Sequence, residues 1–450
     1  MTRDKEVSAR AADSQESVPA DAGTAGAGGG QAVRAERILI LTPQFPYPPH
    51  QGTTIRNYNL IKGLAQRHDV HLLSFGEPQA GRGTPLDGLC RSVQIVRAPQ
   101  RSTRQRLRGL LLSRLPDMAQ RLPSAQFRAA LAATLERERP TVVEVEGIEL
   151  APYLFQAAAQ RAGRDRPLLV FDEHNAEYVL QQRAFETDLG QIWPPRRAAV
   201  RRLAGAVYSL VQWRRLRRYE LRACRTADRV VAVSDVDAGV LRRLDPGLEP
   251  VVVPNGVDMA FYAESPPPLP EGEEGPDAAD LVFVGKMDFR PNVDAVLWFA
   301  AEVLPLIRRQ APETRFWIVG QNPHARLAPL ADEPGVQVTG WVEDQRPYIA
   351  AAGVYVIPLR IGGGTRLKVL EAMAMSKAIV STALGCEGFD LVAGQELIVA
   401  DKPVAFADAV LALLGDPARR ERLGRAARRF AGSRYDWSTI VPKLERVYAS

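Results

Sequence analysis

A glycine-rich loop followed by two cations and a carboxylate is the part of this sequence with the clearest chemical potential. The run Gly-Gly-Gly-Thr-Arg-Leu-Lys-Val-Leu-Glu at 362–371 comes directly after the apolar segment 354–357. Glycine lets the backbone approach a phosphate, and the start of a helix offers free N–H groups. The pattern therefore predicts a phosphate-bearing ligand, with positive charge from Arg366 and Lys368 beside it.

Three other groups of polar residues also follow apolar segments. A proline-rich loop at 43–52 ends in Gly52, two acids and His174 follow the segment 168–171, and Gly285 and Lys286 follow the segment 281–284. Ligands of open parallel sheets bind at the carboxyl ends of strands, so these loops are where functional residues are expected. Each has a structural interpretation as well: a rigid turn, a hydrogen-bonding residue at a strand end, and a solvated charge.

The segments that carry these residues alternate with amphipathic helical stretches. The first series of expected strands is 37–42, 69–75, 142–145, 168–171 and 229–233, and the second is 251–253, 281–284, 315–319, 336–338, 354–357 and 378–380. This alternation predicts parallel pairing with right-handed crossovers. The expected fold class is α/β, with two Rossmann-like, doubly wound parallel sheets in tandem.

The domain boundaries follow from this pattern. Residues 1–36 mix alanine, glycine, serine and charges with almost no large apolar side chain, which predicts a disordered tail. We expect a first domain at 37–247, a second at 248–432, and a C-terminal helix at 433–450.

Composition narrows the class of protein and its compartment. The chain has 450 residues, 46% of them hydrophobic and 24% charged, which is ordinary for a globular protein. Three scattered cysteines form no CxxC pair, so neither a zinc site nor a disulfide framework is indicated. No apolar run approaches the roughly 20 residues of a membrane-spanning helix, and the N-terminus lacks the apolar core of a secretory signal. We expect a cytoplasmic protein.

The loops already described, together with Val-Pro-Asn-Gly-Val-Asp at 253–258 and Gly-Trp-Val-Glu-Asp at 340–344, resemble the retaining GT-B glycosyltransferases of the family 4 type. The resemblance runs from about residue 37 to the C-terminus, in the expected order. It implies two Rossmann-like domains facing a cleft, with the nucleotide-diphosphate sugar on the second domain and the acceptor on the first. It also implies that the last helix crosses back to the first domain.

The resemblance assigns roles to individual residues. Glu371 matches the glutamate that binds the nucleotide ribose, and Trp341 and Val342 lie in the segment that shapes the base pocket. His174, which approaches the donor sugar, and Lys286, which neutralises the diphosphate, are the catalytic candidates. The residues expected to contact the donor diphosphate and sugar are Gly52, Gly285, Lys286, Gly363, Gly364, Thr365, Arg366, Leu367 and Lys368.

Two positions depart from the family pattern. Gly363 stands where a carboxylate is usual, eight positions before Glu371. Asn292 stands where a second basic residue is usual, six positions after Lys286. We hypothesise that Arg366 and Lys368 supply the missing positive charge from the other side of the diphosphate.

The expected reaction moves a sugar to a hydroxyl acceptor in glycan, exopolysaccharide or glycolipid synthesis. We expect fixed cations and helix amides, and not a metal ion, to stabilise the departing nucleotide diphosphate. The resemblance implies attack by the acceptor on the face that the leaving group vacates, without a protein nucleophile. We expect neither a metal nor a cofactor, and the nucleotide sugar is a substrate.

Arginine is concentrated in two stretches that the donor site does not explain. They are Arg101, Arg104, Arg106, Arg108, Arg114, Arg121 and Arg128, and then Arg196, Arg197, Arg201, Arg202, Arg214, Arg215, Arg217, Arg218, Arg222 and Arg225. A basic amphipathic surface suits anionic lipid headgroups and a lipid-linked acceptor, while a solvated charged face is the alternative. No nucleic-acid-binding fold accompanies the charge, so a nucleic-acid partner is not expected.

Two other functions fit the same architecture. A sugar-nucleotide epimerase would need further acid and base groups, and a non-catalytic nucleotide-sugar-binding protein would tolerate glycine at position 363. A nicotinamide-dependent oxidoreductase is disfavoured because the first strand is followed by a proline-rich loop instead of GxGxxG.

Overall fold

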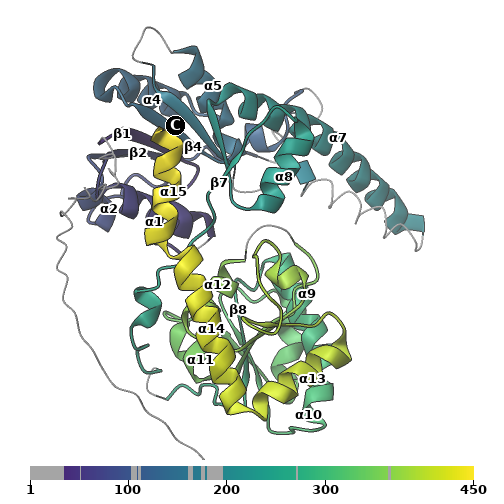
Figure 1. Ribbon diagram of the computed structural model, residues 1–450. Helices are drawn as coiled ribbons and strands as arrows, with labels where there is room; N and C mark the ends of the chain where they lie inside the picture. Colours follow the sequence, from purple (N-terminus) through teal and green to yellow (C-terminus); the bar gives the residue numbers. More distant parts are fainter. Residues whose placement is uncertain are drawn as a thin grey trace, which may run out of the picture. The chain divides into compact units, whose positions relative to one another are not determined.

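The computed structural model describes residues 35–50, 52–102, 109, 113–160, 166–173, 178–179, 196–269, 272–362 and 366–449, and for 196–207 the backbone alone. Within these residues the chain forms two parallel sheets, each covered by helices (Figure 1). This agrees with the predicted fold class. The predicted tail lies almost entirely outside the described residues.

The first sheet has the strand order β3-β2-β1-β4-β5-β6-β7, and every pairing is parallel. Its strands are β1 (Arg37–Thr42), β2 (Asp69–Phe75), β3 (Ser92–Val96), β4 (Val142–Glu146), β5 (Leu168–Glu173), β6 (Arg229–Ala232) and β7 (Val251–Val252). Its helices are α1 (Gly52–Leu64), α2 (Pro85–Leu89), α4 (Ala125–Glu138), α5 (Ala151–Ala159), α7 (Arg196–Thr226) and α8 (Asp235–Leu244).

One predicted strand belongs to a different sheet from the one expected. The segment 251–253 was assigned to the second series, but β7 pairs with β6, with Val251 opposite Val231. It therefore completes the first sheet. The local pattern shows that the segment is a strand but contains nothing about which sheet it joins, because that depends on pairing with a remote segment.

The second sheet has the order β10-β9-β8-β11-β12-β13 and is also parallel throughout. Its strands are β8 (Leu281–Val284), β9 (Phe316–Val319), β10 (Val336–Gly340), β11 (Val354–Ile357), β12 (Ile379–Ser381) and β13 (Ile398–Val399). Its helices are α9 (Arg290–Trp298), α10 (Leu304–Arg308), α11 (Arg346–Ala351), α12 (Leu367–Ala374), α13 (Pro403–Leu414) and α14 (Pro417–Tyr435). The strand order reverses between β8 and β11.

The central strands of the second sheet are uniformly apolar. Every residue of β8, β9 and β11 is buried, as expected for parallel strands covered on both faces. Phe283, Phe316 and Tyr355 are among the largest fully buried side chains of this core. The sheet is therefore a rigid base for the loops at its carboxyl edge.

The last two helices pack on different sheets. Helix α14 contacts α12 of the second sheet, and α15 (Trp437–Ala449) contacts α1 of the first (Figure 1). Ile440 and Leu444 of α15 share a core cluster with Ile38 and Leu60. Between the two helices, Asp436 forms an isolated parallel bridge with Val257.

Among the described residues, no helix is both long and apolar enough to cross a membrane.

Candidate functional site

The point where the strand order of the second sheet reverses lies between β8 and β11. These strands pair directly, with Val354 opposite Leu281 and Tyr355 opposite Val282. The loops after them lead in opposite directions, to α9 and to α12, so their carboxyl ends form the crevice in which α/β sheets bind ligands. Residues 285–286 and 366–371 therefore lie at the same crevice, although they are far apart in the sequence.

Lys368 lies in the first turn of α12 and points back over β8. Its Nζ donates a hydrogen bond to Asn292 Oδ1 at 2.8 Å and lies 4.1 Å from the centre of the Phe283 ring. The pKa of Lys368 is lowered to about 7, mainly by burial; Glu371 opposes the shift and Arg366 adds to it. A lysine with this pKa gains its charge readily when an anion approaches.

Gly285 makes room for this lysine. A Cβ at position 285 would lie 2.8 Å from Lys368 Nζ and 2.7 Å from Asn292 Nδ2, closer than real side chains approach. This glycine was predicted to contact the donor diphosphate and sugar. The structure shows that its missing side chain leaves space for a cation.

Glu371 lies one turn after Lys368 on the same face of α12. Its Oε2 accepts a hydrogen bond from Gln345 Nε2 at 3.4 Å, and the Tyr262 hydroxyl also bonds this carboxylate. Burial raises the pKa of Glu371, while Lys368, Tyr262 and Gln345 favour the ionised form. Sequence reasoning missed Tyr262 and Gln345, because neither lies in a motif next to Glu371.

Lys286 follows β8 and is more accessible than Lys368. Its Nζ lies 3.6 Å from Asp288 Oδ2, and the two side chains are 43% and 41% exposed. An exposed pair of this kind contributes little to stability, so the Lys286 side chain is free to turn toward a ligand. Its backbone carbonyl accepts a hydrogen bond of 2.8 Å from Asn292 Nδ2.

The predicted base-binding residues lie at the end of β10. Trp341 is 69% exposed, and it follows Gly340, whose φ of +73° suits glycine. Val342 is partly buried against the core of the second sheet. A large exposed indole at the carboxyl edge of a sheet is available for stacking on a planar ring.

The remaining predicted residues are only partly described. Gly52 is the first residue of α1, and a Cβ there would lie 3.6 Å from Leu367 Cδ1, which brings it beside the start of α12. Arg366 precedes α12, and its guanidinium lies close to Gly362. His174, Gly363, Gly364 and Thr365 lie outside the described residues.

A group of charges at the carboxyl edge of the first sheet was not predicted. Glu144, Glu146 and Asp172 are 1%, 1% and 0% exposed, and one oxygen from each lies within 4.8 Å of the others. Arg56 of α1 donates to Asp172 Oδ2 at 2.6 Å and to the carbonyl of Val253 at 3.1 Å. The signal in the sequence was the pattern Val-Val-Glu-Val-Glu, which places two acids in an otherwise apolar strand.

We call these four residues the carboxylate cluster. Three carboxylates so close together could share a cation, and the guanidinium of Arg56 provides it. Although burial opposes its charge, Asp172, Glu146 and Glu144 raise the pKa of Arg56. Arg56 thus places a positive charge of the protein itself beside the three acids.

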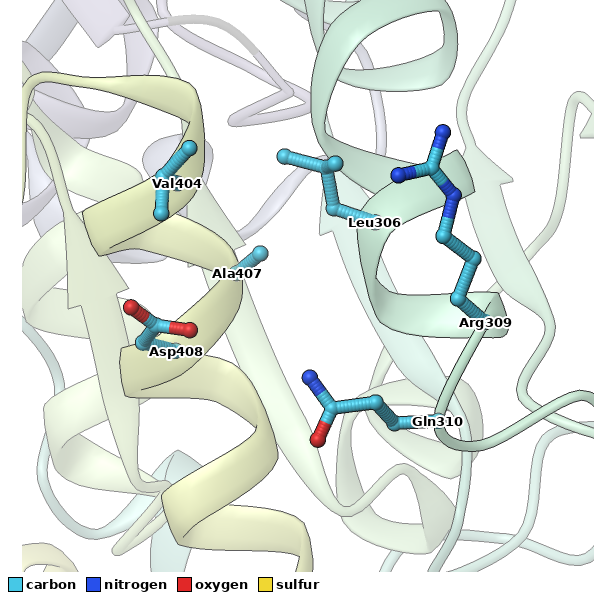
Figure 2. A pocket seen from close by; sticks show the side chains of 6 residues that line it. All are labelled: Leu306, Arg309, Gln310, Val404, Ala407 and Asp408. Carbon is cyan, nitrogen blue, oxygen red and sulfur yellow. The ribbon is translucent and has the colours of Figure 1, made fainter.

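A pocket on the second sheet's helices is separate from these residues. Leu306 and Arg309 lie on or beside α10, and Val404, Ala407 and Asp408 lie on α13, with Gln310 at the rim (Figure 2). None of the predicted site residues lines it. We attribute it to the imperfect packing of two surface helices.

Both halves of the chain match glycosyltransferase families. Residues 51–261 match Glycosyltransferase Family 4, and residues 278–416 match Glycosyl transferases group 1. Together with the two parallel Rossmann-like sheets, these matches place the chain in the GT-B glycosyltransferase family.

Particular relatives share about half of their length with the chain. A phosphatidyl-myo-inositol mannosyltransferase of Mycolicibacterium smegmatis is 30% identical over 209 residues, which are 45% of this chain and 52% of the relative. A glycogen synthase of Mycobacterium tuberculosis is 32% identical over 219 residues, which are 45% of this chain and 49% of the relative. The chain thus spans about half the length of the curated relatives it matches.

Solved structures match over nearly the whole chain. A sucrose-phosphate synthase of Thermosynechococcus elongatus has a TM-score of 0.65 at 17% identity, covering 92% of this chain and 98% of that one. The Anabaena protein HepE, solved in complex with UDP, has a TM-score of 0.61 at 14% identity, covering 92% and 99%. At these identities the likeness establishes the fold.

Proposed function

We propose that the chain is a retaining glycosyltransferase that moves a sugar from a nucleotide-diphosphate sugar to a hydroxyl acceptor. The observation that carries the proposal is the meeting of Lys286, Lys368 and Glu371 at the switch point of the second sheet. Two cations and a carboxylate match the two ends of a nucleoside diphosphate, its phosphates and its ribose. The UDP in HepE supports the same ligand class, and the name mannosyltransferase of a curated relative supports sugar transfer.

In this proposal each residue has a separate task. Lys286 and Lys368 neutralise the diphosphate as the bond from the sugar anomeric carbon to the phosphate oxygen breaks. Glu371 accepts hydrogen bonds from the two vicinal ribose hydroxyls. His174 would position the donor sugar.

The acceptor hydroxyl attacks the anomeric carbon on the face that the leaving group vacates. A bond from the acceptor oxygen to carbon forms as the carbon–phosphate oxygen bond breaks, and the acceptor proton passes to a phosphate oxygen of the departing diphosphate. Retention of configuration follows without a protein nucleophile. With two lysines and helix amides stabilising the leaving group, the reaction needs no divalent metal.

A ligand screen followed by product analysis tests the proposal. A thermal-shift screen of UDP-, GDP- and ADP-sugars should raise the melting temperature with one nucleotide class, because a ligand that binds the folded state stabilises it. NMR of the product should show the anomeric configuration of the donor, with turnover unaffected by EDTA. No shift with any of the three classes would refute the proposal, and epimerised donor formed without acceptor would show an epimerase instead.

We further propose that the acceptor is a glycan or is lipid-linked, and that the protein works at the cytoplasmic face of an anionic membrane. The exposed residues Arg214, Arg217, Arg218 and Arg222 of α7 recur at the spacing of one helical face. Within the 101–128 stretch, by contrast, Arg101 lies 3.0 Å and Arg121 lies 3.7 Å from the Asp117 carboxylate. The basic face of α7 is therefore the better candidate for lipid contact.

Flotation with anionic vesicles at low salt tests this surface. Replacing Arg214, Arg217 and Arg218 with glutamine should abolish flotation. The matched control replaces the exposed Arg419, Arg422 and Arg425 of α14, which removes the same charge elsewhere. Equal loss in both variants, or no binding by the native protein, would refute membrane attachment through α7.

A further inference from the structure

We propose that Asn292 is a positioning residue that holds Lys368 as the second diphosphate-binding cation. In this proposal the second cation is a residue of α12, and the uncharged Asn292 of α9 positions it. The inference rests on the proposed function, because it assumes that the site binds a nucleoside diphosphate. It identifies Asn292 as the residue that connects the two strand-loop-helix units of the site.

The amide of Asn292 is bonded at both ends. Its Oδ1 accepts a hydrogen bond from Lys368 Nζ at 2.8 Å, and its Nδ2 donates one of 2.8 Å to the carbonyl oxygen of Lys286. An ammonium can only donate and a carbonyl can only accept, so the orientation of the amide is determined by its partners. Asn292 is 5% exposed, which keeps water from competing for these bonds. The Asn292 side chain thus fixes both the loop that carries Lys286 and the ammonium of Lys368.

The surroundings of Lys368 Nζ hold the ammonium without cancelling its charge. The Phe283 ring lies beneath it at 4.1 Å, and Gly285 leaves the space that it occupies. The charged side chains that act on it are Glu371 and Arg366, with opposite effects. Among the described residues no carboxylate lies within ion-pair distance of Lys368, so the charge remains available to an anion.

The neutral character of Asn292 matters for the same reason. A lysine at 292 would bring a second ammonium to the place that Lys368 Nζ occupies, and two like charges there would repel. An aspartate would pair with Lys368 and neutralise it, and it could not donate to the Lys286 carbonyl. Asparagine can accept a hydrogen bond from the Lys368 ammonium and donate one to the Lys286 carbonyl, and it adds no charge.

Calorimetric binding of UDP, GDP and ADP to matched variants tests the inference. With the nucleotide that the native protein binds, Asn292→Ala should weaken binding by about tenfold, since a hydrogen bond to a charged group is lost. Asn292→Lys alone should also weaken it, and the double variant Asn292→Lys with Lys368→Asn should recover to within about threefold of the native protein. Gln310→Ala, which removes an exposed amide of the same domain, is the control and should bind as the native protein does.

Proton exchange separates a positioning role from a merely structural one. Binding of the diphosphate should be accompanied by proton uptake at pH 8, detected as a binding enthalpy that varies with the ionisation enthalpy of the buffer. Asn292→Ala should change this uptake while the melting temperature changes little. Native-like affinity and uptake in Asn292→Ala, or a double variant no better than the single variants, would overturn the inference alone. Absence of binding by the native protein would overturn the proposed function with it.

Discussion

The carboxyl edges of the two sheets both gather charged side chains, but they use them in opposite ways. At the first sheet Arg56 is 1% exposed, and it meets Asp172 at 2.6 Å and the backbone carbonyls of Val253 and Pro254. At the second sheet Lys368 is held by an amide and an aromatic ring, which are neutral. The difference is between a cation paired with a carboxylate and a cation held by neutral groups.

The carboxylate cluster also involves the end of the chain. Burial, followed by the charges of Glu146 and Asp172, raises the pKa of Glu144 well above its usual range. The Tyr448 hydroxyl of α15 donates a hydrogen bond to Glu144. The cluster therefore connects α1, β4, β5 and α15, and Arg56 is its one cation.

The largest effect that we predict is the loss of that cation. Arg56→Met should lower the free energy of unfolding by about 3–5 kcal/mol, because breaking a buried pair leaves the Asp172 carboxylate without its guanidinium. Urea unfolding followed by circular dichroism measures the change. The control is Lys62→Met on the same helix, whose pair with Asp258 at 3.3 Å is exposed and should contribute less than about 1 kcal/mol. Similar losses in the two variants would show that the cluster is not a special source of stability.

The second prediction concerns the carboxylate of Glu371 at the carboxyl edge of the second sheet. Glu371→Gln should lower kcat/KM for the donor by about 100-fold, which corresponds to about 2.7 kcal/mol, the scale of two hydrogen bonds to a charged group. The pKa of Glu371 is raised in the folded state, so its ionised form costs stability at neutral pH. Removing the charge should therefore not lower the melting temperature.

A nucleotide without ribose hydroxyls shows whether the loss of kcat/KM in Glu371→Gln comes from the contact between Glu371 and the ribose. The native protein should discriminate a nucleotide from its 2′,3′-dideoxy form, and Glu371→Gln should not. Tyr262→Phe, which removes a hydrogen bond to the same carboxylate, should fall between the two. If all three proteins discriminated equally between the two nucleotides, Glu371 would not be the residue that recognises the ribose.

The third prediction is a pH dependence of donor binding. The pKa of Lys368 is lowered to about 7, so its charge is present below that pH and lost above it in the free protein. A bound diphosphate raises this pKa, and the affinity should fall about tenfold for each pH unit above 7 until the pKa of the complex is reached. Lys368→Arg retains the charge at every relevant pH and should flatten the profile between pH 7 and 9. A native profile as flat as that of the arginine variant would refute the assignment.

The local sequence pattern was sufficient to predict those strands whose own residues are all apolar. The strands 354–357 and 281–284 were predicted with their observed bounds because every residue in them is apolar and buried. β3 was missed because most of its residues are only partly buried, and β13 was missed because it has two residues, both partly buried. Lys286, Lys368 and Glu371 could be selected as candidates because each lies in a strand-loop-helix unit with recognisable spacing.

What the sequence could not indicate are contacts between remote positions. Arg56 and Asp172 are 116 positions apart, Lys368 and Asn292 are 76 apart, and Gln345 and Glu371 are 26 apart. No local spacing connects such residues, because the sheets bring them together. Asn292 was recognised only as a missing charge, and its function as a bridge required the geometry of both helices.

The smallest effect that we predict concerns Trp341, which is exposed at the carboxyl edge of the second sheet. Trp341 is 69% exposed, so stacking on a nucleotide base there should contribute about 1 kcal/mol, at the low end of the range for aromatic side chains. Trp341→Ala should weaken nucleoside diphosphate binding by roughly fivefold, whereas Trp341→Phe should retain most of the affinity. Inorganic pyrophosphate lacks a base, so its binding should be the same in all three proteins. If Trp341→Ala weakened pyrophosphate binding to the same extent, the indole would act on the lysine cations and not on the base.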